Sequence, residues 1–169
     1  MSDRDAAGDA VLTRACEAAF VAMERAYAPY SGFRVGAALV GDDGSLFAGC
    51  NVENAAYPAG ICAERGAIAA AVAQGVRAFQ FIVVATEAAE PTPPCGMCRQ
   101  VLVEFAPALR VVSCTRSGVT AHWNLAELCP HPFSPHSLDP APGLSAPARE
   151  RPTGAGSHEP YRPLRRGRK

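Results

Sequence analysis

Three cysteines and one glutamate, in two short segments, have the residue types and spacing of a catalytic metal site. Glu64 follows Cys62 by two residues, and Cys95 and Cys98 stand in the run Pro-Cys-Gly-Met-Cys. Three thiolates can bind Zn²⁺ and leave one tetrahedral position open to water, which distinguishes a catalytic zinc site from a structural one. A carboxylate beside a ligand could then move protons to and from an activated water molecule.

Two helices are expected to position these groups. The alanine-rich run 60–74 predicts a helix that begins near Cys62 and ends at Gly75. Pro94 marks the start of a second helix, 95–105, whose apolar residues recur at helical spacing. All three thiols would then lie near helix N-termini, where the helix dipole favours thiolate over thiol.

The negative charge of three thiolates exceeds the charge of a zinc dication, so a nearby cation is expected. Arg65 directly follows Glu64 and is the obvious candidate. Its guanidinium could donate charge-assisted hydrogen bonds to the ligand sulfurs.

Two simpler interpretations of the cysteines compete with this one. A lone C-x-x-C can be a redox pair or half of a structural zinc site. A redox pair would need neither Cys62 nor Glu64, whereas a structural site would need a fourth ligand. A C-x-E followed by a P-C-x-x-C is instead the signature of zinc-dependent deaminases. For the structural zinc site, the fourth ligand could come from one of the four further cysteines, namely Cys16, Cys50, Cys114 and Cys129.

Composition indicates one compact domain with reduced thiols. The chain has 169 residues, is 49% hydrophobic and contains seven cysteines, an odd number. The first ten residues are polar and acidic and do not resemble a signal peptide, and no apolar run reaches membrane-spanning length. These features predict a cytoplasmic protein with no membrane partner.

The formal net charge of zero hides a division between two segments. Residues 1–138 contain nine arginines against thirteen acidic residues, and residues 139–169 contain seven basic residues against three acidic ones. The first segment has no basic stripe that would bind a polynucleotide backbone, so a small neutral substrate fits better than nucleic acid. The second is rich in Pro, Gly, Ser and Arg, which predicts disorder from about Asp139. Its basic end could touch nucleic acid or acidic surfaces, but a solvated extension is the simpler interpretation.

The remaining elements predict a mixed sheet with helices on both faces. A first helix should begin at Asp9 as its N-cap, carry apolar residues from Leu12 to Tyr27, and end at Pro29. Asn124 and Glu127 resemble the capping box of a short last helix. Strands are expected over 33–40, 45–51, 80–86, 110–115 and 119–123.

With these motifs in place, the chain resembles a small cytidine deaminase of the homotetrameric, zinc-dependent type. The likeness covers about residues 26–138. It implies a three-layer α/β/α fold with a five-stranded mixed sheet, and a deaminase domain over residues 1–138. The residues that carry it are Ala26-Tyr27-Ala28-Pro29-Tyr30-Ser31, Phe33, Val35-Gly36-Ala37-Ala38, Asn51-Val52-Glu53-Asn54, Tyr57-Pro58, Cys62-Ala63-Glu64-Arg65, Pro94-Cys95-Gly96, Cys98-Arg99-Gln100 and Phe133.

The resemblance also implies a reaction, namely hydrolysis of cytidine and deoxycytidine to uridine and deoxyuridine with release of ammonia, as in pyrimidine salvage. Cys62, Cys95 and Cys98 would bind zinc. Glu64 would take a proton from water, protonate the ring N3 and finally protonate the amine that leaves C4.

Substrate contacts follow from the same resemblance. Asn51 and Glu53 would hydrogen-bond the ribose 3′-hydroxyl, and the backbone N–H of Ala63 would face the pyrimidine carbonyl oxygen. Phe33 would line the base pocket, and Phe133 would reach the site of a neighbouring subunit in a homotetramer. Tyr30, by contrast, is expected to belong to the core.

Two other functions remain open at this point. One is a related deaminase that acts on another aminopyrimidine nucleoside, such as a blasticidin-type antibiotic, although the Asn51 and Glu53 pair suits an ordinary ribose. The other is a zinc-stabilised binding domain that has lost catalysis, which would have no reason to retain Glu64.

Overall fold

The computed structural model describes residues 3–138, with side chains from Gly8 onward. The chain divides into two compact units, residues 1–134 and residues 135–169. Of the second unit, only the 3₁₀ turn η2 (Pro135–Leu138) and no later residue is described. The expected disorder from Asp139 therefore concerns residues outside the described part of the chain.

The first unit is built on a mixed five-stranded sheet. Its strand order is β2-β1-β3-β4-β5, with β3 and β4 parallel and the other neighbours antiparallel. Because a parallel pair needs a crossover, the chain passes from β3 to β4 through helix α3. The strands are β1 (Val35–Gly41), β2 (Leu46–Cys50), β3 (Phe79–Thr86), β4 (Arg110–Thr115) and β5 (Thr120–Asn124).

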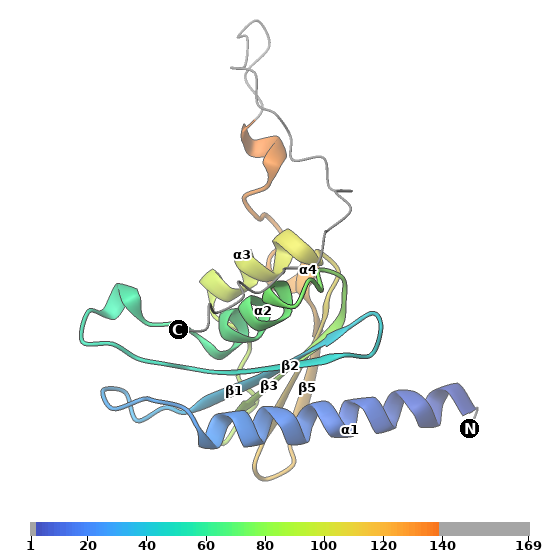
Figure 1. Cartoon of the computed structure of the whole chain (residues 1–169), viewed down its shortest axis with the longest axis horizontal. Helices are drawn as coiled ribbons and strands as arrows, with labels where there is room; N and C mark the ends of the chain where they lie inside the picture. Colours follow the sequence, from blue (N-terminus) through green and yellow to red (C-terminus); the bar gives the residue numbers. More distant parts are fainter. Residues whose placement is uncertain (1–2, 139–169) are drawn as a thin grey trace, which may run out of the picture. The chain divides into compact units, whose positions relative to one another are not determined.

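Helices cover both faces of this sheet and complete three layers, as expected (Figure 1). Helix α1 packs on one face, where its Met23 forms a buried cluster with Val40 and Val83 of the sheet. The opposite face carries the other helices, over a cluster that contains Leu39 and Ile82. The helices are α1 (Asp3–Glu24), α2 (Ala63–Ala73), α3 (Gly96–Phe105) and α4 (Leu125–Leu128), with a 3₁₀ turn, η1 (Tyr57–Ala59), before α2.

A glycine allows α2 to lie close to the sheet. A Cβ atom at Gly49 of β2 would lie 2.4 Å from the backbone oxygen of Ala63 and 2.4 Å from the backbone nitrogen of Ala67. Any larger residue at position 49 would therefore push away the helix that begins beside Cys62.

Most elements lie where the sequence predicts them, but the first helix does not. It begins before Asp9, so this residue is not its N-cap, and it ends at Glu24 rather than near Pro29. Its end has a tertiary cause, because Tyr27 leaves the helix to pair with the segment after β2. The Tyr27 N–H donates to the Asn51 carbonyl, and the Glu53 N–H donates to the Tyr27 carbonyl. The capping box of Asn124 and Glu127 is present as predicted.

No helix among the described residues is long and apolar enough to cross a membrane.

Candidate metal and catalytic site

Three cysteine sulfurs meet where α2 and α3 begin. The Sγ atoms of Cys62, Cys95 and Cys98 all lie within 4.8 Å of one another, and those of Cys62 and Cys95 are 3.9 Å apart. Ligands about 2.3 Å from a tetrahedral zinc ion are about 3.8 Å apart, so the three thiols fit this ion. None of the other four cysteines belongs to the cluster, which leaves the three-ligand set of an open site.

The local backbone places all three thiols at helix N-termini, where the helix dipole favours thiolate. Cys62 is the N-cap of α2, Cys95 is the N-cap of α3, and Cys98 lies in the first turn of α3. Burial raises the pKa of Cys95, but hydrogen bonds from Cys98 and Cys62 outweigh it and lower this pKa overall. Burial and the charge of Glu64 raise the pKa of Cys98. Metal binding would reverse that shift, because zinc takes up thiolate and releases the proton.

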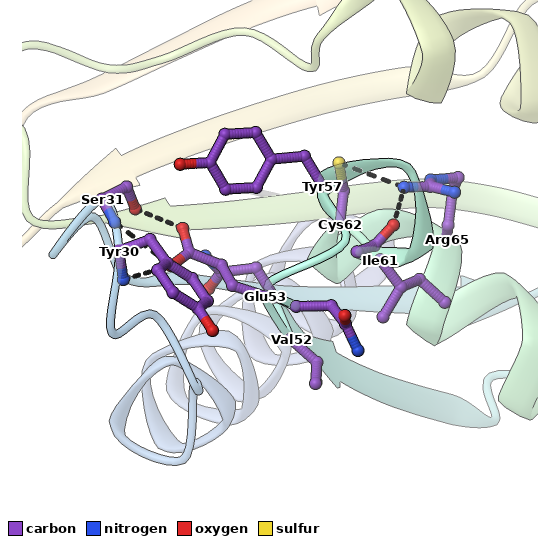
Figure 2. A pocket seen from close by; sticks show the side chains of 11 residues that line it. Tyr30, Ser31, Val52, Glu53, Tyr57, Ile61, Cys62 and Arg65 are labelled. Carbon is purple, nitrogen blue, oxygen red and sulfur yellow. Dashed lines mark hydrogen bonds between the residues drawn. The ribbon is translucent and has the colours of Figure 1, made fainter.

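Arg65 lies beside the sulfurs, as its expected charge-balancing role requires. Its Nη2 is 2.9 Å from the Gly60 carbonyl oxygen, to which it donates, and 3.7 Å from the Cys62 Sγ (Figure 2). The hydrogen bond to Cys62 raises the pKa of Arg65. Its Nε is buried without a hydrogen-bond partner in the described part of the chain. A cation held this close can offset the charge of bound thiolates.

Glu64 is a buried carboxyl group within the first turn of α2. Its side chain is only 4% exposed. Burial raises its pKa above the ordinary value, while hydrogen bonds from its own backbone N–H and from Cys98 lower it in part. It lines an inner cavity of about 290 Å³ together with Cys62 and Cys95. A proton-transfer group and two metal-binding thiols therefore share one small space.

The two residues that are expected to contact the base also lie at the inner cavity. Phe33 and Ala63 line it. Ala63 is the first residue of α2, where a backbone N–H has no acceptor within the helix and is free for a ligand. Five further residues line this cavity that the sequence analysis did not predict as part of the site, because β1 and β3 reach it only through the pairing of the sheet. They are Val35, Val84, Thr86, Thr92 and Pro93.

Asn51 fixes the strand that follows Phe33. Its Oδ1 accepts a hydrogen bond from the Val35 N–H at 2.8 Å, and its Nδ2 donates to the Phe33 carbonyl at 2.8 Å. One amide hydrogen of Asn51 is left for a ligand after these two bonds. The residue therefore combines a structural role with a place on the cavity wall.

Glu53 is held as a charged acceptor at the same wall. It accepts hydrogen bonds from the backbone N–H of Tyr30 at 2.9 Å and of Ser31 at 3.2 Å, and from the Ser31 hydroxyl (Figure 2). These bonds, led by the hydroxyl, lower the pKa of Glu53. Sequence reasoning did not identify Ser31 as the partner of Glu53.

A second, outer cavity of about 490 Å³ adjoins the first and shares Ser31, Asn51, Glu53 and Cys62 with it. Tyr57, on η1, lines this outer cavity and is 77% exposed. Tyr30 lines it too and is 52% exposed, so its expected place in the core is wrong. Tyr30 lies in the turn after α1, and its backbone N–H donates to Glu53, which holds this turn at the cavity rather than in the core.

Phe133 lies apart from the other predicted residues within its own chain. It lines neither cavity, and its side chain is 58% exposed. Phe133 is therefore not part of either cavity of its own chain, and its expected contact with a neighbouring subunit stays a prediction.

Comparisons with known proteins agree with this site. Residues 10–115 match the family described as the cytidine and deoxycytidylate deaminase zinc-binding region. A cytidine deaminase from Sporosarcina psychrophila is 45% identical over 118 residues, which span 69% of this chain and 87% of the relative.

Solved structures give the same result. The crystal structure of cytidine deaminase from Burkholderia pseudomallei is 48% identical and matches with a TM-score of 0.69, over 72% of this chain and 98% of that one. Cytidine deaminase from Mycobacterium tuberculosis is 33% identical with a TM-score of 0.62, over 73% and 97% of the two chains. Together with the cysteine cluster and the buried Glu64, these matches show that the chain belongs to the family of zinc-dependent cytidine deaminases.

Proposed function

We propose that cytidine and deoxycytidine are the substrates of this zinc-dependent deaminase, and that uridine or deoxyuridine and ammonia are its products. The observation that carries this proposal is the inner cavity, where the buried Glu64 lies with two thiols of the cysteine cluster and with Asn51 and Glu53. Of the described residues that line the two cavities, Arg65 is the only basic one, and it is directed at Cys62. This favours a nucleoside over a nucleotide, because a phosphate group would lack a basic partner.

The chemistry divides between the metal and Glu64. Zinc held by Cys62, Cys95 and Cys98 would supply a water molecule of lowered pKa as the nucleophile. Glu64 would accept one proton from this water and deliver it to ring N3, and would then take the second proton from the hydroxyl on C4, as the carbonyl forms, and pass it to the amine that leaves. Burial raises the pKa of Glu64, and a carboxylate of raised pKa is a stronger base toward water.

Other groups orient the base and the ribose. The Ala63 N–H donates to the pyrimidine carbonyl oxygen, and Phe33 packs on the base. Asn51 has a hydrogen left to donate, and Glu53 can accept, so together they satisfy both sides of one ribose hydroxyl. A base without ribose would leave these groups unpaired and would be rejected.

The activity can be tested directly by ultraviolet absorbance. Cytidine and deoxycytidine should be consumed by purified protein, and a zinc chelator should abolish the reaction. A related antibiotic nucleoside should be a poorer substrate than cytidine, because the ribose contacts fit an unmodified sugar. A protein that binds zinc but leaves all these nucleosides intact would instead indicate the binding domain.

Glu53→Gln tests the ribose contact. The Gln oxygen can still accept from the Tyr30 and Ser31 N–H groups, and its amide can donate to the Ser31 hydroxyl, so the local structure should persist. We expect kcat/KM for cytidine to fall by a factor that corresponds to the loss of about 1–3 kcal/mol of transition-state binding. Asn51→Ala should cause a loss of at least this size, because it also removes the bonds to Phe33 and Val35.

3′-Deoxycytidine provides the control for the ribose contact. This substrate lacks the hydroxyl, so wild type and Glu53→Gln should process it at similar rates. An equal loss with both substrates would show that Glu53 acts on the structure rather than on the ribose.

We further propose a cytoplasmic homotetramer in which a neighbouring subunit completes each site with Phe133. Two observations support the shared site: Phe133 is exposed and lies outside both cavities, and the outer cavity carries the exposed rings of Tyr30 and Tyr57. In a closed symmetric assembly, these exposed aromatic side chains would be buried in the same way on every subunit. The seven cysteines are all free, which supports the cytoplasmic location.

The division into a deaminase domain, 1–138, and a dispensable tail, 139–169, gives a deletion experiment. Removing residues 140–169 should leave zinc content, oligomer mass and cytidine turnover within about twofold of the full chain, a shift under about 0.5 kcal/mol. Deletion from Pro130 should abolish activity, because it also removes Phe133. Light scattering and cytidine assays check both variants. A fully active monomer would contradict the shared site, and an inactive 140–169 deletion would contradict the dispensable tail.

A further inference from the structure

One side chain holds both polar backbone groups of Phe133. The Gln100 Nε2 donates to the Phe133 carbonyl oxygen at 2.7 Å, and the Phe133 N–H donates to the Gln100 Oε1 at 3.0 Å. A side-chain amide that pairs with both groups of one residue fixes that residue much as a neighbouring strand would. An exposed phenylalanine in an irregular segment is thus held in one backbone conformation.

The helix that supplies this clamp also supplies two metal ligands. Gln100 lies on α3, two residues after Cys98. The preceding residue, Arg99, donates from Nη1 to the Leu128 carbonyl at 3.0 Å and from Nε to the Pro94 carbonyl at 2.7 Å. The segment 128–133 is therefore attached at both ends to the first two turns of α3.

The fixed position of Phe133 does not contribute to the candidate site of its own chain. Phe133 lines neither of the two cavities described above, and it is 58% exposed. A fixed backbone does, however, reduce the conformational entropy that Phe133 would lose when another surface takes up its ring. The clamp makes physical sense if the ring acts on a second molecule.

We infer that Gln100 is a positioning residue that presents Phe133 to the nucleoside pocket of a neighbouring copy of this chain. The inference rests on the proposed shared site and deepens it. Gln100 touches neither the substrate nor the metal in this arrangement. It contributes to substrate binding in a pocket that belongs to another subunit.

Gln100→Met tests the clamp, because Met has the same length but can make neither hydrogen bond. We expect KM for cytidine to rise about 5- to 30-fold, while kcat stays within about threefold of wild type. This is the pattern expected when a variant loses an interaction that stabilises the bound substrate and the transition state equally. Gln100→Glu keeps the acceptor for the Phe133 N–H and should have an intermediate KM. Zinc content should be unchanged in both. Glu104→Gln, at an exposed position of the same helix, is the matched control and should behave as wild type.

Mixed oligomers show whether Gln100 acts across subunits. A Glu64→Gln chain cannot transfer protons but retains an intact clamp, whereas a Gln100→Met chain has the opposite defect. Co-expression of the two with different tags, followed by isolation of the mixed species, should create sites with Glu64 from one chain and Phe133 from the other. At low cytidine concentration, random assembly should restore about one quarter of the wild-type activity per site.

The outcomes separate the inference from the function on which it rests. Mixed oligomers with only the average activity of the two parent variants would overturn the action of Gln100 across subunits. A Gln100→Met enzyme with wild-type KM would overturn the clamp itself. A wild-type protein that leaves cytidine intact would contradict the proposed function instead. If Gln100→Met does not fold, Gln100→Glu replaces it in the mixing experiment, and the activity of the mixed oligomers is again compared with the average of the two parent variants.

Discussion

Glu64→Gln should lower kcat for cytidine by at least about 100-fold while zinc remains bound at one ion per chain. The amide has nearly the same size as the carboxyl group and fits the same buried position, which is only 4% exposed. It cannot, however, accept a proton from water or deliver one to the base. The three cysteines are untouched, so the metal should stay. Steady-state kinetics and atomic absorption on the same sample measure both quantities.

Glu17→Gln is the control for this variant. Glu17 is an exposed residue of α1, on the opposite face of the sheet from α2 and α3, which carry the three-cysteine cluster, and its amide variant should match wild type. If Glu64→Gln retained the wild-type kcat, another group would have to transfer the protons, and the assignment of Glu64 would be wrong.

Cys95→Ala should abolish zinc binding and deamination together. Its Sγ lies 3.9 Å from that of Cys62, and two remaining thiols cannot form the three-ligand set. Zinc should fall from about one ion to below about 0.1 ion per chain after dialysis. Metal binding also contributes to folding, so a chelator should lower the thermal midpoint of wild type but leave that of Cys95→Ala unchanged.

Cys129→Ala separates loss of the metal site from loss of a thiol in general. Cys129 is partly buried and follows α4, outside the cysteine cluster. We expect this variant to keep its zinc and its activity. Full zinc content and turnover in Cys95→Ala would show that the metal is bound elsewhere.

The chemistry and the elements that carry it could be predicted from short stretches of sequence. Cys62 and Glu64 are two residues apart, and Cys95 and Cys98 are three apart, so the local sequence alone places both members of each pair at the start of one helix. Apolar runs marked the strands, and Asn124 with Glu127 marked a helix start. These signals are local, because propensity, capping and periodicity act over a few residues.

The shape of the site was decided by contacts between residues that are distant in the sequence. Asn51 bonds across 16 residues to Val35, and Glu53 bonds across 22 and 23 residues to Ser31 and Tyr30. None of these three partners follows from a motif, because each depends on which segments pair in the folded sheet and in what register.

The same dependence explains why the end of the first helix was predicted wrongly and why the clamp on Phe133 was not predicted. The periodicity of the first helix continues to Tyr27, but backbone pairing with the Asn51 segment ends the helix at Glu24. The clamp on Phe133 joins residues 33 positions apart. The sequence alone thus determined which residues could do the chemistry, since those patterns are local. Only the tertiary structure decided how the binding residues are held, since their partners meet only when the sheet has formed.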